Sequence, residues 1–196
     1  LQRACDEYRA THLIHLAALL TPDCQQDPWL GCQVNVLGSM AVFELARLAK
    51  DRIRGFSYAS SYAVYGPEAD DSPTLGVVAG NRPPSFYGAF KKSVDLIAEQ
   101  YWRHFQIASV GIRPHVVYGP ERTVGLTAGP SLAARAAARG EACPINYTGT
   151  VGYDYVEDVA RAFVRAALET PPGAHVVDLP SQPASTQEVV RLIDAA

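Results

Sequence analysis

Apolar residues along the chain fall into two kinds of segment that alternate with each other. Continuous apolar runs of strand length occupy residues 11–18, 56–61, 107–117 and 175–179. Longer segments with helical spacing or alanine-rich composition cover residues 27–50, 85–105, 131–139 and 155–168. A last helix is predicted to open at Ser185, because Ser185-Thr-Gln-Glu188 is a capping box. This alternation predicts an α/β fold whose parallel sheet is covered on both faces.

The ends of three predicted strands carry the polar and small residues of interest. They are His15-Leu-Ala-Ala18, Ser60-Ser61 and Arg113-Pro-His115. Parallel sheets of this kind bind ligands at the carboxyl ends of their strands, so we expect one site at this edge. Residues 68–84 are rich in Gly, Pro, Asp and Asn, which predicts a surface loop.

Tyr87-Gly-Ala-Phe-Lys91 places a phenol and an ammonium on one face of a predicted helix. A nearby cation favours the phenolate, so a tyrosine in this setting can exchange a proton with an alcohol or a carbonyl. Ser61, or alternatively Ser60, would hydrogen-bond the same oxygen. The bare pair is weak evidence, because an exposed tyrosine and lysine at this spacing are common on helices.

Six segments together resemble the extended short-chain dehydrogenase/reductases, the group of NAD-dependent sugar epimerases and dehydratases. They are Ile14-His-Leu-Ala-Ala18, Val34-Asn-Val-Leu-Gly38, Ser60-Ser-Tyr-Ala-Val-Tyr-Gly66, Ser85-Phe-Tyr-Gly-Ala-Phe-Lys91, Arg113-Pro-His-Val-Val-Tyr-Gly-Pro120 and Asp154-Tyr-Val-Glu-Asp158. The resemblance runs from about Ile14 to the end of the chain. It implies a Rossmann-type, doubly wound parallel sheet with part of a small substrate-binding lobe.

The resemblance also implies roles for individual residues. Ser61 matches the catalytic serine, Tyr87 the general acid/base, and Lys91 the lysine that also binds the nicotinamide ribose. The remaining matches to cofactor-binding positions are Leu16, Ala17, Ala18, Ser60, Pro114 and His115. The implied cofactor is NAD, with NADP left open. Asn35 matches a residue of the helix behind the site, although a buried structural amide is an equally good interpretation.

Two departures from the family bear on the substrate. Val116 and Tyr153 stand where sugar-nucleotide enzymes commonly place an asparagine and an arginine that hold the substrate's diphosphate. Arg122 or Arg135 could compensate, although each is more often a solvated surface residue. These departures argue against naming a UDP- or dTDP-sugar as the substrate, and a smaller polyol, a sugar acid or a hydroxy-carbonyl compound stays open. Dehydration is disfavoured, because Tyr62-Ala63 follows the serine in place of an acidic pair.

The glycine-rich G-x-x-G-x-x-G loop of the family does not occur in this sequence. We therefore expect a Rossmann-type domain without its first βαβ unit. Residues 1–120 and 154–180 are assigned to that domain, residues 121–153 to the substrate lobe, and residues 181–196 to a partial continuation of the lobe. A catalytically inactive dinucleotide-binding module, or a truncated fragment, is the alternative to an enzyme.

Composition excludes several other classes of function. The formal net charge of −3 gives no basic excess for nucleic-acid phosphates. The four cysteines have no C-x-x-C spacing and the histidines no ligand spacing, so no metal site is expected. We also expect no disulfide framework, no apolar run of bilayer length, and a cytoplasmic protein. The family's usual dimer contacts on the helices holding Asn35 and Tyr87 predict a homodimer.

Overall fold

The computed structural model describes residues 1–66 and 82–195 and divides into two compact units. The first unit comprises Leu1–Arg113 and Arg161–Asp178, and the second comprises Pro114–Ala160 and Leu179–Ala196. Residues 114–120 and 154–160, which we expected in the Rossmann-type domain, thus cluster with the second unit. The predicted loop over residues 68–84 lies mostly outside the described residues.

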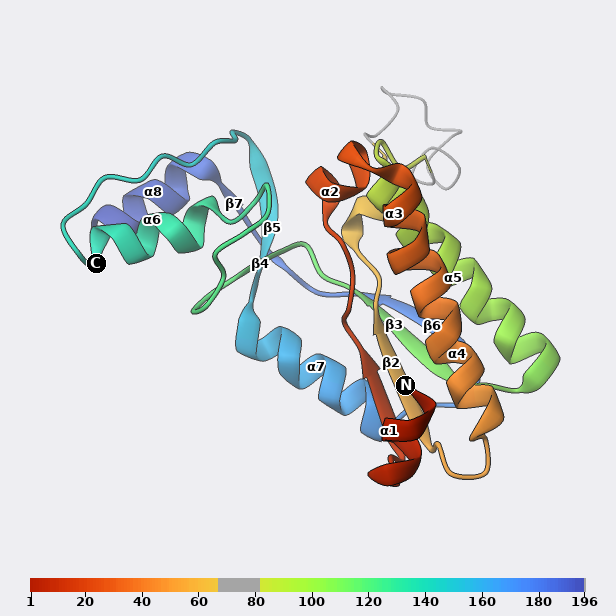
Figure 1. Ribbon diagram of the computed structural model, residues 1–196. Helices are drawn as coiled ribbons and strands as arrows, with labels where there is room; N and C mark the ends of the chain where they lie inside the picture. The colour runs from red at the N-terminus through yellow and green to blue at the C-terminus, as the bar shows by residue number, and fades with distance from the viewer. Residues whose placement is uncertain (67–81, 196) are drawn as a thin grey trace, which may run out of the picture. The chain divides into compact units, whose positions relative to one another are not determined.

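The first unit is built on a parallel sheet of four strands in the order β1-β2-β3-β6. The strands are β1 (His12–His15), β2 (Gly55–Ala59), β3 (Ser109–Arg113) and β6 (Ala174–Asp178). Neighbouring strands are in register, with His15 opposite Tyr58 and Arg113 opposite Asp178. All four strands therefore end at the same edge of the sheet, as the apolar pattern predicted (Figure 1).

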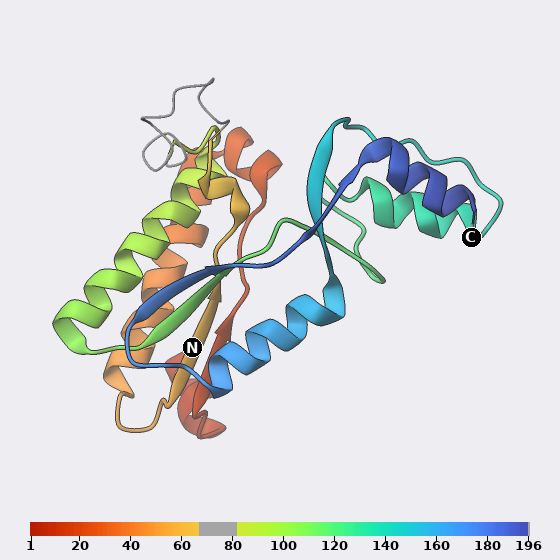
Figure 2. The same ribbon diagram turned by 180° about the vertical axis from the view of Figure 1, so that it is seen from behind.

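Helices cover both faces of this sheet. Helices α4 (Gly38–Leu48) and α5 (Phe86–Phe105) lie on one side and α7 (Val156–Leu168) on the other (Figures 1 and 2). The core between the sheet and the first two helices consists of Val42, Phe43, Ala46, Phe56, Tyr58, Val94, Ala98, Tyr101 and Ile107. On the other face, Phe163 and Ala167 of α7 are buried, and the Phe163 carbonyl accepts a 2.9 Å hydrogen bond from Ser57 Oγ. The predicted doubly wound arrangement is confirmed.

The apolar segment over residues 27–50 is not one regular helix. It consists of α3 (Pro28–Cys32), a π-helical segment η1 (Gln33–Leu37) and α4, preceded by the short α2 (Thr21–Gln26). Our expectation that no apolar run reaches bilayer length was wrong, because Pro28–Leu48 has the length and composition to cross a membrane. Core helices of soluble proteins pass the same test. Here the segment buries Val42 and Phe43 against the sheet.

Helix α5 follows the prediction closely. Ser85 caps it, since its Oγ accepts a 3.1 Å hydrogen bond from the amide of Gly88. The helix ends at Phe105, and Gln106 follows in the left-handed region with φ 59°. Two short elements complete the first unit, α1 (Gln2–Glu7) and the 3-10 turn η2 (Tyr62–Val64) that directly follows Ser61.

The second unit contains a three-stranded sheet and two helices. Strand β4 (Val116–Tyr118) pairs in parallel with β5 (Thr150–Tyr155), which pairs antiparallel with β7 (Gln182–Ser185). The helices are α6 (Gly129–Ala137) and α8 (Thr186–Asp194). The capping box at Ser185 is confirmed, because Ser185 and Glu188 exchange backbone and side-chain hydrogen bonds.

The single strand predicted over residues 107–117 was wrong. The chain forms β3 up to Arg113, leaves the first sheet at Pro114, and enters the second sheet as β4. Proline has no amide hydrogen to donate to a ladder. The amide of His115 instead donates a 2.7 Å hydrogen bond to Oδ2 of Asp154. Strands β5 and β7 were not predicted, since they are short and lead directly into helices α7 and α8.

Candidate active site

The carboxyl end of β2 and the first turns of α5 bring the predicted catalytic residues into one neighbourhood. Lys91 Nζ donates a 2.7 Å hydrogen bond to the carbonyl of Ala59, the last residue of β2. The same nitrogen lies 5.7 Å from the centroid of the Tyr87 ring. Gly88 allows the helix to approach the turn after Ser61, because a Cβ at this position would overlap the carbonyl oxygen of Ala63.

Lys91 is the most deeply buried cation of this neighbourhood, with 5% of the residue exposed. Burial lowers its pKa from the ordinary 10.5 to about 8, against the opposing influence of Asp95 and Cys24. Burial and, secondarily, the positive charge of Lys91 also lower the pKa of His15. The side chain of His15 is fixed by a 2.9 Å hydrogen bond between its Nε2 and Ser39 Oγ.

The two adjacent serines at the end of β2 have different environments. Ser60 is 2% exposed, and its hydroxyl donates a 3.0 Å hydrogen bond to Oδ2 of Asp95. Ser61 is half-buried, and its Oγ accepts a 3.1 Å hydrogen bond from the amide of Ala63. Within the described residues the hydroxyl hydrogen of Ser61 stays available for another oxygen, whereas that of Ser60 is already engaged. This difference favours Ser61 over Ser60 as the substrate-facing serine.

Asn35 holds the chain just after the end of β1. Its Oδ1 accepts a 2.8 Å hydrogen bond from the amide of Leu19, and its Nδ2 donates a 2.9 Å bond to the Leu19 carbonyl. Asn35 is 1% exposed and belongs to the π-helical segment, a local geometry that is frequent near functional sites. The structure therefore supports a buried amide that fixes the backbone of the predicted cofactor-binding segment Leu16, Ala17 and Ala18.

The residues at this edge fit the ribose of a dinucleotide. An ammonium carries three donors, and within the described residues Lys91 Nζ uses one of them, on Ala59. A buried cation with donors to spare suits a pair of ribose hydroxyls. The segment after β1 is open to a ligand, because Leu16 is 55% exposed and Ala17 is exposed as well. The glycine-rich loop that would bind the pyrophosphate is not part of this sequence.

Pro114 and His115 belong to the second unit, so their contact with the cofactor stays a prediction. In the same unit Tyr153 is 7% exposed, and its hydroxyl lies 3.0 Å from that of Tyr147. Burial, followed by the Tyr153 hydrogen bond, raises the pKa of Tyr147. The guanidinium of Arg122 donates to the carbonyl of Val117 and, over 2.8 Å, to Thr127 Oγ1. Arg122 thus contacts β4 and its own loop.

The sequence pattern placed Arg113 at a strand end of the expected site, but it did not identify Asp95 or the pairing of the two residues. Arg113 Nη2 and Asp95 Oδ2 are 2.7 Å apart, and both side chains are almost fully buried. The available signal was positional, because Tyr87, Lys91 and Asp95 recur every four residues and share one face of α5.

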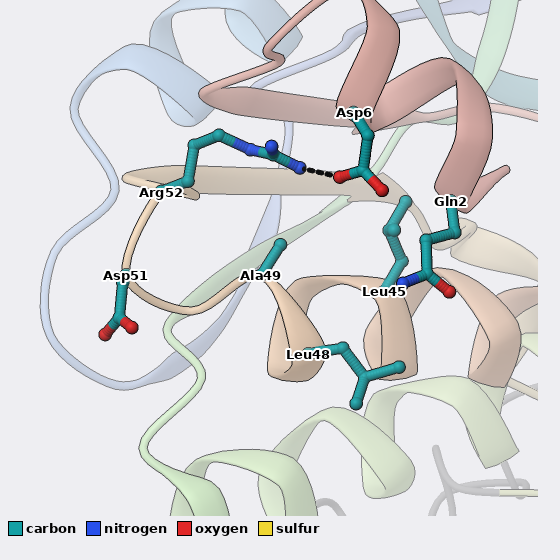
Figure 3. A pocket seen from close by; sticks show the side chains of 7 residues that line it. All are labelled: Gln2, Asp6, Leu45, Leu48, Ala49, Asp51 and Arg52. Atoms are coloured by element: carbon teal, nitrogen blue, oxygen red, sulfur yellow. Dashed lines mark hydrogen bonds and ion pairs between the residues drawn. The ribbon is translucent and has the colours of Figure 1, made fainter.

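A pocket of about 180 Å³ lies at the opposite, amino end of the sheet. It is lined by Gln2, Asp6, Leu45, Leu48, Ala49, Asp51 and Arg52 (Figure 3). None of the predicted site residues lines it. Within the part of the chain that the structure describes, no three His, Cys, Asp or Glu side chains gather to hold a metal ion. The four cysteines are free thiols.

Comparison with known proteins gives a consistent result. The model of the family described as "NAD dependent epimerase/dehydratase family" matches residues 1–177. UDP-glucose 4-epimerase of Mycolicibacterium smegmatis is 31% identical over 169 residues, which cover 82% of this chain and 51% of that protein. D-erythronate dehydrogenase of Haemophilus influenzae is 30% identical over 101 residues, covering 52% and 31% respectively. The chain spans about half of the first relative's length and less of the second's.

Solved structures of similar proteins share the fold. UDP-glucose 4-epimerase from Thermus thermophilus, crystallised with NAD, is 26% identical with a TM-score of 0.80. The match covers 99% of this chain and 64% of that chain. A monomeric L-threonine 3-dehydrogenase from a metagenome is 23% identical with a TM-score of 0.82, again covering 99% and 64%. At this identity the second match shows the fold alone.

Proposed function

Because the chain belongs to the NAD dependent epimerase/dehydratase family, we propose that it carries the acid/base half of an NAD(P)-dependent epimerase or dehydrogenase site. The reaction would take place at a hydroxyl or carbonyl carbon of a sugar, a sugar nucleotide or a related small polyol. One observation carries this proposal: Lys91 places a buried ammonium beside Tyr87 and the strand end that leads to Ser61. An inactive dinucleotide-binding module would not need this set of groups.

The proposed chemistry divides among three side chains. A bound nicotinamide would accept or return a hydride at the reacting carbon. Tyr87 would take the proton of the substrate hydroxyl through its phenolic oxygen, and return it in the reverse direction. The hydroxyl of Ser61 would donate to the same substrate oxygen and hold it near the phenol. The positive charge of Lys91 would stabilise the phenolate, while its remaining N–H groups would bind the ribose hydroxyls.

The second unit favours a substrate without a diphosphate. Tyr153 and Val116 cannot supply the positive charge or the amide that a diphosphate requires, and both are at most 7% exposed. The Arg122 guanidinium already binds the carbonyl of Val117 on β4 and the Thr127 hydroxyl. We therefore rank sugar acids and polyols ahead of sugar nucleotides as substrates.

Substitution of Tyr87 tests the function directly. In the complete gene product, Tyr87→Phe is expected to lower kcat by about 10²- to 10⁴-fold, because the proton carrier is lost. Cofactor affinity, measured by fluorescence quenching, should change little. Tyr8→Phe is the matched control, since Tyr8 is 77% exposed on the first unit. Ordinary turnover in Tyr87→Phe would show that the assignment is wrong.

The substrate requires a panel of sugar acids, polyols and sugar nucleotides, each with NAD and with NADP. Absorbance of the reduced cofactor reports dehydrogenation. Product analysis is needed for an epimerase, because epimerisation causes no net change in the cofactor.

We also propose that the complete protein is a homodimer through α3, α4 and α5. These helices and the η1 segment between α3 and α4 leave large apolar side chains exposed, namely Trp29, Leu30, Leu37, Leu48, Phe86, Leu96 and Phe105. Sedimentation equilibrium should give twice the chain mass, and Leu37→Glu combined with Leu96→Glu should shift the protein to monomer. A monomeric wild-type protein would contradict this proposal.

A further inference from the structure

A buried ion pair lies directly behind the proposed active site. Arg113 is the last residue of β3, and Asp95 stands four residues after Lys91 on α5. Oδ2 of Asp95 accepts hydrogen bonds from Arg113 Nη2 over 2.7 Å and from Arg113 Nε over 3.2 Å. The two side chains are only 10% and 4% exposed. The pair therefore joins a helix to a strand within the core.

Asp95 also binds one side chain of the neighbouring strand β2 and one from the residue directly after it. Ser60 Oγ donates a 3.0 Å hydrogen bond to Oδ2, and the hydroxyl of Tyr58 donates a 3.2 Å bond to Oδ1. One carboxylate thus accepts four hydrogen bonds from two adjacent strands. Burying an ion pair costs solvation free energy and contributes little net stability. Its connections, rather than its strength, indicate what the pair does.

Arg113 extends the same network to the other side of the Ser61 turn. Its Nη1 donates a 2.6 Å hydrogen bond to the hydroxyl of Tyr65, the residue that follows η2. The Tyr65 hydroxyl donates a 2.9 Å bond to Oδ2 of Asp178, the last residue of β6. The short segment that contains Ser61 is therefore anchored at both ends, at Ser60 by Asp95 and at Tyr65 by Arg113.

We propose that Asp95 and Arg113 are positioning residues, which fix the Ser61 turn and maintain the positive charge of Lys91. This inference rests on the function proposed above. Neither residue touches the substrate in this scheme. Arg113 acts through Tyr65, whereas Asp95 acts through Ser60 and, one helical turn away, through Lys91.

The electrostatics around Lys91 agree with this role. The groups that face its ammonium are Tyr87 and Asp95 on α5, Cys24 on α2 and His15 on β1. Burial lowers the pKa of Lys91, and Asp95 is the stronger of the two groups that oppose the shift. Without the Asp95 carboxylate the pKa falls further, so Lys91 loses its proton at a lower pH. The alkaline limb of the pH–activity profile should therefore also move to lower pH.

The test uses the complete gene product with variants of the buried pair and one control. Asp95→Asn removes the charge and keeps the shape, while the double variant Asp95→Leu with Arg113→Met replaces the whole pair by apolar groups. The second variant leaves no buried charge unpaired, so it is expected to fold. Arg165→Gln with Glu169→Gln is the control, because it removes an exposed ion pair on α7.

For both Asp95 variants we expect kcat to fall by about 10- to 100-fold with KM for the cofactor nearly unchanged, since a small misplacement of Ser61 is sufficient. The alkaline limb of the kcat profile should shift downward by about half a pH unit or more in Asp95→Asn. Asp95→Glu, which restores the charge, should move that limb back toward its wild-type position. The control variant Arg165→Gln with Glu169→Gln should leave kcat, KM for the cofactor and the alkaline limb unchanged.

A second readout does not depend on activity. NMR titration of carbon-labelled lysine should give a lower pKa for Lys91 in Asp95→Asn than in the wild type, and recovery in Asp95→Glu. An unshifted Lys91 titration, or wild-type kcat and pH profile in the folded double variant, would overturn the inference. A wild-type protein without turnover on any substrate would refute the proposed function, and the lysine titration would then decide the inference alone.

Discussion

Two arginine–aspartate pairs lie at opposite ends of the first sheet. Their nitrogen–oxygen distances are nearly equal, but their burial and their further partners differ. At the carboxyl end, Arg113 and Asp95 are 2.7 Å apart with side chains 10% and 4% exposed. At the amino end, Arg52 and Asp6 are 2.6 Å apart with side chains 30% and 55% exposed (Figure 3). The distance alone would not distinguish them.

What distinguishes the two pairs is their set of further partners. Asp95 also binds Ser60 and Tyr58, and Arg113 also binds Tyr65, so the first pair connects the ends of β2 and β3 with the turn after Ser61. Arg52 binds Cys5 besides Asp6, and its Nε is buried without a hydrogen-bond partner among the described residues. The comparison teaches that the connections and burial of an ion pair, not its geometry, indicate a role in the site.

The largest expected effect concerns Lys91, at the carboxyl end. Lys91→Met removes the charge that stabilises the phenolate of Tyr87 and the donors for the ribose. We expect kcat to fall by about 10²- to 10⁴-fold, with weaker cofactor binding. Arg52→Met removes a cation at the amino end and should leave both quantities unchanged. Steady-state kinetics and fluorescence titration of the complete gene product measure kcat and cofactor affinity in both variants. An equal loss of kcat in the two variants would show that the two ends of the sheet do not differ in function.

The second largest effect is expected in the free energy of unfolding, which should fall more when Arg113 is replaced than when Arg52 is replaced. Arg113→Met leaves the Asp95 carboxylate buried without its charged partner, which is expected to cost about 3–5 kcal/mol in the free energy of unfolding. Arg52→Met leaves an Asp6 that is half exposed and readily hydrated, so its effect should be small. Urea unfolding followed by circular dichroism provides both values. Comparable destabilisation would show that burial does not separate the pairs.

The pH dependence of stability offers a third contrast. The pKa of Lys91 is about 8 in the folded chain and 10.5 ordinarily, so the unfolded chain binds more protons between these values. Stability must then rise with pH across this window, as the penalty for the buried charge disappears. The gain relative to Lys91→Met should be about 3 kcal/mol, because each pKa unit corresponds to about 1.4 kcal/mol. Urea unfolding of both proteins below and above the window measures it, and a flat difference would contradict the burial of a charged lysine.

Asn35→Ala is the smallest of the four expected effects. It leaves the amide and the carbonyl of Leu19 without their side-chain partners, which should cost about 1–3 kcal/mol. The backbone that follows β1 should become looser, so cofactor affinity is expected to fall while turnover at saturation is retained. Asn35→Asp keeps one acceptor for the Leu19 amide and serves as a partial control. Unchanged cofactor binding in Asn35→Ala would remove this residue from the site.

Much of the local structure followed from the sequence. Helical spacing and the cap Ser85 predicted α5 nearly to the residue, and the capping box at Ser185 predicted where α8 begins. The failures have local causes as well. Pro114 divides a continuous apolar run into β3 and β4, and the π-helical segment interrupts a helix whose apolar spacing looks uniform. Hydrophobic periodicity reports which residues are buried, but not where a backbone ladder changes its partner.

The sequence by itself determined the order of the four strands of the first sheet and of the long helices between them, and the candidates Ser61, Tyr87 and Lys91, whose catalytic roles stay predictions. These features depend on neighbours a few residues apart, where apolar spacing and the four-residue helical repeat act. Only the tertiary structure decided that Ser60 is engaged by Asp95 and that Arg113 holds Tyr65. Residues distant in the sequence meet there because four parallel strands end at one edge, where buried polar groups must satisfy one another's hydrogen bonds.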